Sequence, residues 1–490
     1  MLLDGTLCFY GIVKGCSFSY ISLRRKNKLI GRFGNTIAAI ATPIGRGAIS
    51  VIRVSGEAAI LKVASRFKGK INLSSAQSHT AHFGRIVDDN NETVDEVVCT
   101  IFRAPKSFTG EDTVEVSCHG GIFVTRRVLE CILETGVRLA EPGEFTQRAF
   151  LNGKIDLSQA EAVADLIQAQ SDKAQKTSLD QLEGVLSKQI HIVREQLVQS
   201  LGLLELELDF SEENITLIDK NKAESLFKLA IQELDQLIKT YKYGKVFREG
   251  VRVALVGVPN AGKSSLLNAL LKEDRAIVTN VPGTTRDFIE EKMIIAGVLF
   301  RMIDTAGLRE TEDIVEKEGL LRTWKVIKSS DLIVFVHDST KIIEPEELGF
   351  IDTIKKEKHK ELIIANNKID IQQNQMPLEH ISEKAQIIET SALNNTGIEF
   401  LKDELFKKVL DQPHPENKES VIITNERHYS AILKTKHCMI SALDSLKNGK
   451  SEEFIAVDLR AAIESIGEII GLITTEEILN NIFSKFCIGK

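Results

Sequence analysis

The amino-acid sequence predicts a multidomain α/β protein in which an α-helical domain is split in sequence by an inserted, doubly wound α/β domain. Three observations predict this fold. Short apolar alternations mixed with helical stretches fill residues 36–153, as in an α+β domain. Residues 157–243 are nearly free of Gly and Pro and carry apolar residues three and four apart, which is typical of long amphipathic helices. Apolar strands alternate with helices over residues 248–410, and helical periodicity resumes after a polar, Pro-containing linker at 411–420.

These boundaries divide the chain into five segments. We expect a basic extension at residues 1–35, an N-terminal domain at 36–153, the first part of the helical domain at 154–247, the inserted domain at 248–410, and the second helical part, which ends in FCIGK, at 411–490. The extension is either an organelle transit peptide, which would place the protein in the mitochondrial matrix, or an upstream extension of a cytoplasmic protein. The absence of a clear amphipathic helix favours the cytoplasmic alternative.

Composition and charge limit the classes of function. The formal net charge of −7 and a pI near 5.9 argue against a basic surface that wraps nucleic acid, so any contact with RNA needs a local patch or a partner protein. The seven cysteines contain no Cys-x-x-Cys pair, which suits a reducing compartment. No run of about 18 uninterrupted apolar residues is present, so we expect no stable membrane insertion.

The inserted domain opens with a phosphate-binding pattern, GVPNAGKS at residues 257–264, which lies between an apolar strand and a helix. Gly257 and Gly262 permit backbone conformations that let successive amides turn around a phosphate at a helix N-terminus. Lys263 supplies a cation there, and the Ser264 hydroxyl is expected on a Mg²⁺ ion that bridges the outer phosphates. A Gly-rich turn without a ligand is the alternative, and motifs further along the chain argue against it.

Two segments indicate where the terminal phosphate binds. DTAG at residues 304–307 ends a predicted strand, so Asp304 can hold the water shell of the magnesium ion and the Gly307 amide can reach the phosphate. TNVPGTTR at 279–286 lies where GTPases carry a mobile loop that contacts the terminal phosphate, and Thr285 is the expected second magnesium ligand. Arg286 is either a cis arginine finger or a solvated loop charge, and the solvated charge is favoured.

Two further motifs indicate that the base is guanine. NKID at residues 367–370 follows a predicted strand at 361–365. The Asp370 carboxylate can accept hydrogen bonds from the ring NH and the amino group of guanine, and adenine offers neither donor to such a carboxylate. Ser391 and Ala392, after one more predicted strand, would direct a backbone amide at the guanine oxygen.

The expected GTP-binding residues fall in five short stretches of the chain. They are Asn260, Ala261, Gly262, Lys263, Ser264 and Ser265; Thr279, Asn280, Val281, Pro282, Gly283, Thr284 and Thr285; Asp304, Thr305, Ala306 and Gly307; Asn367, Lys368 and Asp370; and Ser391, Ala392 and Leu393. Many regulatory GTPases carry a Gln after the DxxG motif to orient the attacking water, but Leu308 stands here. Hydrolysis is therefore either slow without a partner or served by another group, such as a carboxylate of Glu310, Glu312 or Glu316.

From residue 36 to residue 490 the sequence resembles the MnmE/TrmE family of tRNA modification GTPases. The motifs that carry the resemblance are TIAAIATPIGRG at 36–47, PGEFTQRAFLNGKIDL at 142–157, GTTRD at 283–287, DTAGLR at 304–309 and FCIGK at 486–490. The family implies an N-terminal folate-binding and dimerisation domain, a homodimer, and a heterotetramer with the flavoprotein MnmG, which carries FAD. It also implies addition of an aminomethyl or carboxymethylaminomethyl group to C5 of the wobble uridine of certain tRNAs, with a one-carbon unit from 5-formyl- or 5,10-methylene-tetrahydrofolate.

The resemblance also implies roles for single residues. The residues that would line the folate site are Arg53, Glu115, Lys154 and Lys490. A carboxylate there can pair with the amino and NH edge of a pterin, and cations can meet the carboxylates of the folate tail. The family uses K⁺ in place of an arginine finger, and the matching positions are Asn260, Thr279, the Val281 carbonyl and Thr284. Glu316 matches the carboxylate that orients the water, which makes the catalytic set Glu316, Lys263, Thr285 and Gly307.

Two alternatives stay open from the sequence. Cys487, between the apolar Phe486 and Ile488, is either a nucleophile or a buried structural thiol, and the structural interpretation is favoured. The motifs between residues 257 and 392 also fit an Era- or Der-like switch in ribosome assembly that does no chemistry on RNA. Such proteins append a KH domain or a second GTPase domain, and the flanking sequence shows neither a GxxG-bearing KH pattern nor a second phosphate loop.

Overall fold

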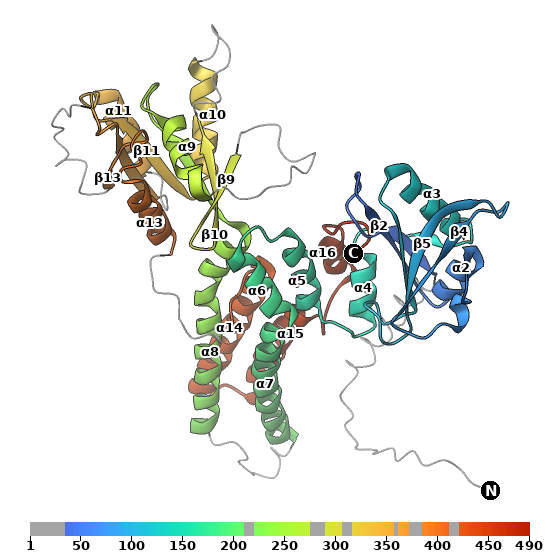
Figure 1. The fold of residues 1–490 in the computed structure, drawn as a ribbon. Helices are drawn as coiled ribbons and strands as arrows, with labels where there is room; N and C mark the ends of the chain where they lie inside the picture. Colours follow the sequence, from blue (N-terminus) through green and yellow to red (C-terminus); the bar gives the residue numbers. More distant parts are fainter. Residues whose placement is uncertain are drawn as a thin grey trace. The chain divides into compact units, whose positions relative to one another are not determined.

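The computed structural model describes residues 35–209, 220–274, 290–305, 316–356, 361–371, 385–410 and 421–490. The described chain forms two compact units (Figure 1): one contains the residues up to Ala164 together with Ile463–Lys490, and the other is Asp165–Ala462. The predicted extension, apart from Asn35, and the predicted linker at 411–420 lie outside the described residues. Among the described residues, no helix is both long and apolar enough to cross a membrane. A multidomain α/β chain is confirmed, while the five predicted boundaries stay a prediction.

The first unit is built on a seven-stranded sheet in the order β3-β4-β5-β6-β2-β1-β7. Its strands are β1 (Ile37–Ile40), β2 (Ile49–Ser55), β3 (Phe67–Gly69), β4 (Thr80–Val87), β5 (Thr93–Phe102), β6 (Thr113–His119) and β7 (Arg138–Leu139). All neighbours are antiparallel except β1 and β7. Helices α2 (Ala59–Arg66) and α3 (Ile122–Leu133) contribute Ile60 and Val128 to the buried cluster on one face.

The C-terminal segment of the chain belongs to this first unit. On the face of β1 opposite that cluster, Ile37 and Ala39 pack with Phe145 of α4 (Glu144–Leu151). The short helix α16 (Glu476–Phe483) packs on α4, and a Cβ at Gly143 would lie 2.6 Å from the Phe483 carbonyl oxygen. Helix α5 (Leu157–Gln168) and the 3₁₀ turn η1 (Leu73–Ser75) complete the elements before the second unit.

The second unit begins and ends with long helices. They are α6 (Asp172–Leu182), α7 (Val185–Asp209), α8 (Lys220–Glu249), α14 (Glu426–Lys447) and the first part of α15 (Glu452–Ile470), whose residues from Ile463 on belong to the first unit. Helices α8 and α14 pack together although the whole sheet of this unit lies between them in the chain (Figure 1). The rings of Tyr241 and Tyr429 stack with their centroids 4.1 Å apart, and the Ile423 N–H donates a 3.1 Å hydrogen bond to Thr240 Oγ1.

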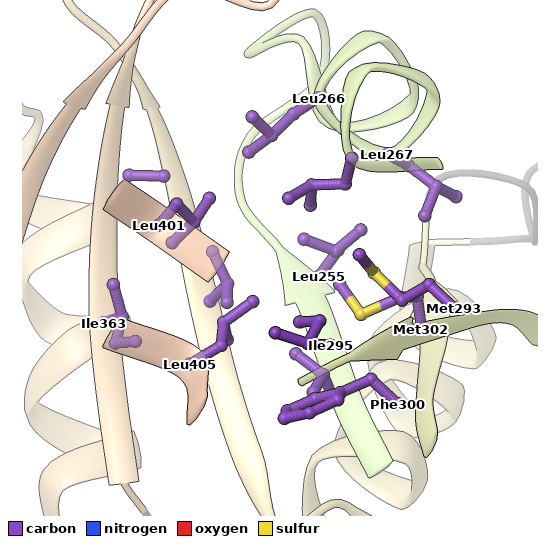
Figure 2. Close-up of a cluster of buried hydrophobic side chains, with 14 of the residues drawn as sticks. Leu255, Leu266, Leu267, Met293, Ile295, Phe300, Met302, Ile363, Leu401 and Leu405 are labelled. Atoms are coloured by element: carbon purple, nitrogen blue, oxygen red, sulfur yellow. The ribbon is translucent and has the colours of Figure 1, made fainter. Parts of the chain in front are cut away.

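The sheet of the second unit has six strands in the order β13-β12-β11-β8-β10-β9. They are β8 (Val251–Val256), β9 (Glu290–Ile295), β10 (Val298–Asp304), β11 (Leu332–Asp338), β12 (Glu361–Asn367) and β13 (Gln386–Thr390); only the β9–β10 pair is antiparallel. Apolar side chains of α9 (Lys263–Asp274) and α13 (Ile398–Val409) pack on one face (Figure 2). Helices α10 (Glu316–Ser329) and α11 (Pro345–Lys356) lie on the other. The carboxyl ends of five neighbouring parallel strands thus meet at one edge, where such sheets bind ligands.

Gly244 lets the backbone of the segment before α14 approach α8 closely. A Cβ at Gly244 would lie 2.1 Å from the Ile423 carbonyl oxygen and 2.9 Å from Ile422 Cγ2. A glycine inside a helix costs about 1 kcal/mol relative to alanine, so this position favours close approach over helix propensity. By contrast, a Cβ at Gly202 in α7 would meet no atom within 4 Å.

We expect Gly244→Ala to lower the free energy of unfolding by about 1–3 kcal/mol, because the added methyl group must push the facing backbone away. The matched control Gly202→Ala should raise it by up to about 1 kcal/mol, since only helix propensity changes. Thermal unfolding of the full chain, followed by the helical circular dichroism signal, measures both changes. An equal rise in stability for the two variants would show that the close approach at Gly244 is not a constraint.

Candidate functional site

The phosphate loop between β8 and α9 has the backbone geometry that its glycines predict. Gly257 and Gly262 adopt φ values of +149° and +94°, and Asn260 lies between them at +65°. A Cβ at Gly257 would lie 2.3 Å from the Val336 carbonyl oxygen, and one at Gly262 would lie 2.3 Å from Asn367 Nδ2. Any side chain at either position would therefore collide with the neighbouring strand ends, so both glycines are required by conformation and by space.

The two residues expected at the magnesium ion, Ser264 and Asp304, lie together. Ser264 Oγ, in the first turn of α9, donates a 2.8 Å hydrogen bond to Oδ2 of Asp304, the last residue of β10. Lys263 is buried, and its Nζ donates to the carbonyl oxygens of Gly257 (3.0 Å) and Val258 (2.8 Å). Thr305 Oγ1 donates 2.8 Å to the Leu255 carbonyl, which ties the end of β10 to β8. A hydroxyl and a carboxylate oxygen beside a phosphate loop are the hard oxygen ligands that Mg²⁺ takes, so these residues fit the ion.

Asn367 connects three loops at the same edge of the sheet. Its amide is 1% exposed; Nδ2 donates 3.1 Å to the Ala261 carbonyl, and Oδ1 accepts 3.2 Å from the Ala392 N–H. Asp370 Oδ1 accepts a 2.5 Å hydrogen bond from Ser391 Oγ. The structure thus brings together the phosphate loop, the NKID segment and the Ser-Ala segment, as the sequence predicts. Ser265 and Leu393 are exposed at the margins of this region.

Asp338 is a residue of this site that the sequence prediction missed. Lys368 Nζ donates 2.8 Å to the Asn260 carbonyl and 2.6 Å to Asp338 Oδ2. Burial by itself raises the pKa of Asp338, but hydrogen bonds from Lys368 and Thr340 more than offset this, so the pKa lies below its ordinary value. Asp338 ends the apolar strand β11, and an acid that follows an apolar run is too common a pattern to identify a site residue from the sequence alone.

Several predicted residues lie outside the described part of the chain. These are the loop residues Thr279, Asn280, Val281, Pro282, Gly283, Thr284 and Thr285, together with Ala306 and Gly307. Glu316 is the first residue of α10, but its side chain is likewise outside the description. The potassium ligands other than Asn260, and the catalytic set other than Lys263, therefore stay predictions.

In the first unit, Arg53 and Glu115 form a pair across β2 and β6. The two residues are register partners, and Arg53 donates to Glu115 Oε1 from Nε (3.0 Å) and Nη2 (2.8 Å). Within the described chain Oε2 of Glu115 accepts no hydrogen bond. The Arg53 guanidinium lies 5.4 Å from the ring centroid of Phe108 and 5.8 Å from that of Phe145. Neither aromatic residue is among the site residues expected from the sequence; Phe108 lies between β5 and β6, and Phe145 lies in α4.

Lys490 is brought to this pair from the other end of the chain. Burial lowers the pKa of the Lys490 amine, the nearby Arg53 guanidinium lowers it further, and the Glu115 carboxylate raises it in part. A Cβ at Gly489 would lie 2.3 Å from the Ile40 carbonyl oxygen, so the chain runs tightly against β1 just before Lys490. Cys487 is exposed, which does not support the favoured interpretation as a buried thiol.

Lys154 lies against the loop that carries Phe108. Its Nζ donates 3.1 Å to the Pro105 carbonyl, and a Cβ at Gly110 would lie 3.2 Å from Lys154 Cγ. The structure thus groups Arg53, Glu115 and Lys490 directly, and places Lys154 on their shared loop. A pterin with an acidic tail can be bound by a carboxylate oxygen, by aromatic rings and by cations. In the described chain these groups are Glu115 Oε2, the rings of Phe108 and Phe145, and the two lysines, so the residues fit a folate.

A largely buried ionic network holds the loop between β5 and β6 that carries Phe108. The Arg148 side chain is 2% exposed and bonds to Glu111 Oε2 (3.0 Å) and Glu144 Oε1 (2.9 Å). Ser55 Oγ donates 3.0 Å to the same Glu111 oxygen, which links the network to β2. Burial tends to raise the pKa of Glu144, but hydrogen bonds from Arg138, the Glu141 N–H and Arg148 bring it below the ordinary value. The loop between β5 and β6 is therefore held by an ionic network whose central groups, Arg148 and Glu144, are buried.

The chain is similar to known proteins over nearly its whole length. The family model described as the MnmE helical domain matches residues 157–487, and that of the GTP-binding protein TrmE N-terminus matches residues 36–154. The tRNA modification GTPase MnmE of Aquifex aeolicus is 45% identical, covering 93% of this chain and 99% of that protein. The protein of the same name from Carboxydothermus hydrogenoformans is 42% identical with the same coverage.

Among solved structures, the G domain of the T. maritima FeoB iron transporter is 27% identical with a TM-score of 0.24, and the match covers 33% of this chain and 97% of that one. The MnmE relatives, however, match the flanking segments as well as the nucleotide site, which an Era- or Der-like switch would not explain. The chain therefore belongs to the MnmE family of tRNA modification GTPases.

Proposed function

We propose that this protein hydrolyses GTP and that this turnover supports modification of the wobble uridine of certain tRNAs. The observation that carries the proposal is the meeting of Ser264, Asp304, Asn367 and Asp370 at one edge of a sheet, in a chain that matches MnmE proteins end to end. Ser264 and Asp304 suit the binding of magnesium and phosphate, and Asn367 and Asp370 suit the binding of the guanine edge.

Each described residue has a task that its chemistry suits. The amides of the loop at 257–264 surround the phosphates, and the Lys263 ammonium turns from its carbonyl partners toward phosphate oxygens. Ser264 would hold Mg²⁺ directly and Asp304 through a water molecule, and the bound ion would supply positive charge against the outer phosphates. Asp370 accepts the ring NH and amino group of guanine, and the Ala392 amide donates to its oxygen.

We assign hydrolysis to a potassium-dependent arrangement. The K⁺ ligands would be Asn260, Thr279, the Val281 carbonyl and Thr284, with Thr285 as second magnesium ligand and the Gly307 amide on the terminal phosphate. Glu316 would orient the attacking water, which explains why Leu308 replaces a catalytic Gln. Glu316 is the first residue of α10, the helix that comes next along the chain after the DTAG segment.

The group of Arg53, Glu115, Lys154 and Lys490 would hold a 5-formyl- or 5,10-methylene-tetrahydrofolate, which supplies the one-carbon unit. Glu115 Oε2 would accept hydrogen bonds from the amino and NH edge of the pterin, and the rings of Phe108 and Phe145 would pack beside it. The ammonium groups of the two lysines would pair with the carboxylates of the acidic tail. Together with the FAD protein MnmG, a homodimer of this chain would add an aminomethyl-type group to C5 of the uridine. The packing of α14 on α8 supports a single helical domain that the GTPase domain interrupts.

Asp304→Asn should stop GTP hydrolysis and, in cells that lack the wild-type protein, abolish aminomethyl-type wobble uridines. The amide keeps the hydrogen bond from Ser264 but loses the charge that orders the magnesium shell, a loss of at least about a hundredfold in turnover. Mass spectrometry of tRNA nucleosides from complemented cells gives the result, and Asp352→Asn on the exposed face of α11 is the control. An unchanged nucleoside profile on depletion, with immature ribosomal particles instead, would replace the proposal with an assembly switch.

Glu115→Gln should weaken binding of 5-formyl-tetrahydrofolate by about tenfold or more and leave GTP hydrolysis unchanged, because the amide cannot accept two hydrogen bonds from a pterin while facing Arg53. Glu96→Gln on β5 is the matched control, since its carboxylate also pairs with an arginine, Arg85 (3.2 Å), but in an exposed position. Calorimetric titration measures both affinities. Equal affinity in the two variants would remove Glu115 from the folate site.

Folate affinity should fall as pH rises through the lowered pKa of Lys490, below the ordinary 10.5 of a lysine. The charged amine attracts the acidic tail, and it loses its proton at a lower pH than a free lysine does. Lys490→Arg keeps its charge throughout, so its affinity should not decline over about pH 7–10. The difference between the two curves isolates this residue from the titration of the ligand. Parallel curves would show that Lys490 does not contact the ligand.

A further inference from the structure

We propose that Asp338 is a positioning residue for guanine nucleotides, which acts by holding the Lys368 ammonium against the Asn260 carbonyl of the phosphate loop. This inference rests on the proposed GTPase function and adds a residue to its site. Neither the family motifs nor the sequence prediction assigns Asp338 a role. Through it, the end of β11 would set the distance between the segment that reads the base and the loop that binds the phosphates.

The carboxylate of Asp338 is fixed in place before it meets the lysine. Asp338 is the last residue of β11, pairs in register with Asn367 of β12, and is 4% exposed. Its Oδ1 accepts hydrogen bonds from the Thr340 N–H (3.1 Å) and Thr340 Oγ1 (2.7 Å), which leaves Oδ2 for Lys368 Nζ at 2.6 Å. A buried carboxylate oriented by a turn and by a strand end is a rigid anchor for a flexible lysine.

Lys368 in turn connects two backbone segments that both lie in the left-handed region. Its φ is +69°, and Asn260, whose carbonyl accepts a 2.8 Å hydrogen bond from Nζ, has a φ of +65°. Non-glycine residues adopt this conformation uncommonly, so the surrounding hydrogen bonds help to hold both residues there. The Lys263 ammonium contacts the other end of the loop, at Gly257 and Val258, so Lys368 anchors the loop on the side of the base.

A structural salt bridge is the competing explanation, and the geometry distinguishes the two. The Lys368 side chain is 30% exposed and that of Asp338 is 5% exposed, so solvent screening weakens what the pair by itself contributes to stability. Without the anchor, however, the long Lys368 side chain would no longer be held in one direction, because a lysine has many accessible rotamers. A positioning role therefore predicts a change in nucleotide release that depends on Lys368, whereas a purely structural role predicts only a change in unfolding temperature.

The test uses the full chain and compares Asp338→Asn, Lys368→Ala and the double variant. Release of fluorescent N-methylanthraniloyl-GDP should be faster in Asp338→Asn on the order of tenfold, the range for a charge-assisted hydrogen bond. In the Lys368→Ala background, Asp338→Asn should add less than about twofold, because both changes break one contact. KM for GTP should rise with the release rate while kcat changes little. The matched control is Asp331→Asn. Asp331 directly precedes β11, at the end of the strand opposite Asp338, and its Oδ2 accepts a 2.9 Å hydrogen bond from the Arg252 N–H. The rate of GDP release from this variant should equal that of the wild type.

A second variant keeps the test decisive if Asp338→Asn does not fold. Thr340→Val removes the hydroxyl that orients the carboxylate but keeps the charge, so it should speed release in the same direction by a smaller factor. The inference is overturned if release from Asp338→Asn matches the wild type, if its effect persists in Lys368→Ala, or if Asp331→Asn releases GDP equally fast. When the wild-type chain binds GDP, these outcomes concern Asp338 alone. A wild-type chain that binds no guanine nucleotide overturns both this inference and the proposed function.

Discussion

One buried amide, that of Asn367, holds the nucleotide site together. It bonds to the loop after β8 and to the segment after β13, and it sits at the end of β12 itself. The same amide nitrogen fills the space that a side chain at Gly262 would need. Because protein interiors are close-packed, a larger or smaller group there would shift all three segments at once. The site therefore behaves as a single unit whose parts cannot be optimised separately.

The elements around this amide could be predicted from the sequence because their signals are local. A buried strand, a loop with glycines at fixed spacing and a following helix occupy adjacent residues, and the structure places them as expected. The ion pair of Asp338 with Lys368 could not be predicted in this way, because it joins residues 30 positions apart through strand register. An acid after an apolar run is common, and only the pairing of β11 with β12 shows which lysine it meets.

The group of Arg53, Glu115, Lys154 and Lys490 was even harder to predict from the spacing of residues in the sequence. Arg53 and Glu115 are 62 residues apart, and their contact depends on the register of β2 and β6. Family resemblance suggested these residues, and the structure shows that they share a strand pair. The aromatic rings beside Arg53 and the buried network of Arg148 appear only in three dimensions, since neither follows a sequence period. Resemblance suggested the side chains of this group, and the fold supplies the contacts that orient Arg53 and Glu115.

The first compact unit is discontinuous in the chain, because residues 463–490 join a sheet whose strands all lie before residue 140. During synthesis from the N-terminus, the ribosome therefore completes the entire second unit before the first can receive its final segment. The sheet must persist for that interval with the surface beside β1 and α4 uncovered, at the stage when apolar surface is most prone to aggregate. The order of translation thus makes the residues of the nucleotide site available for folding before Lys490 can reach Arg53 and Glu115.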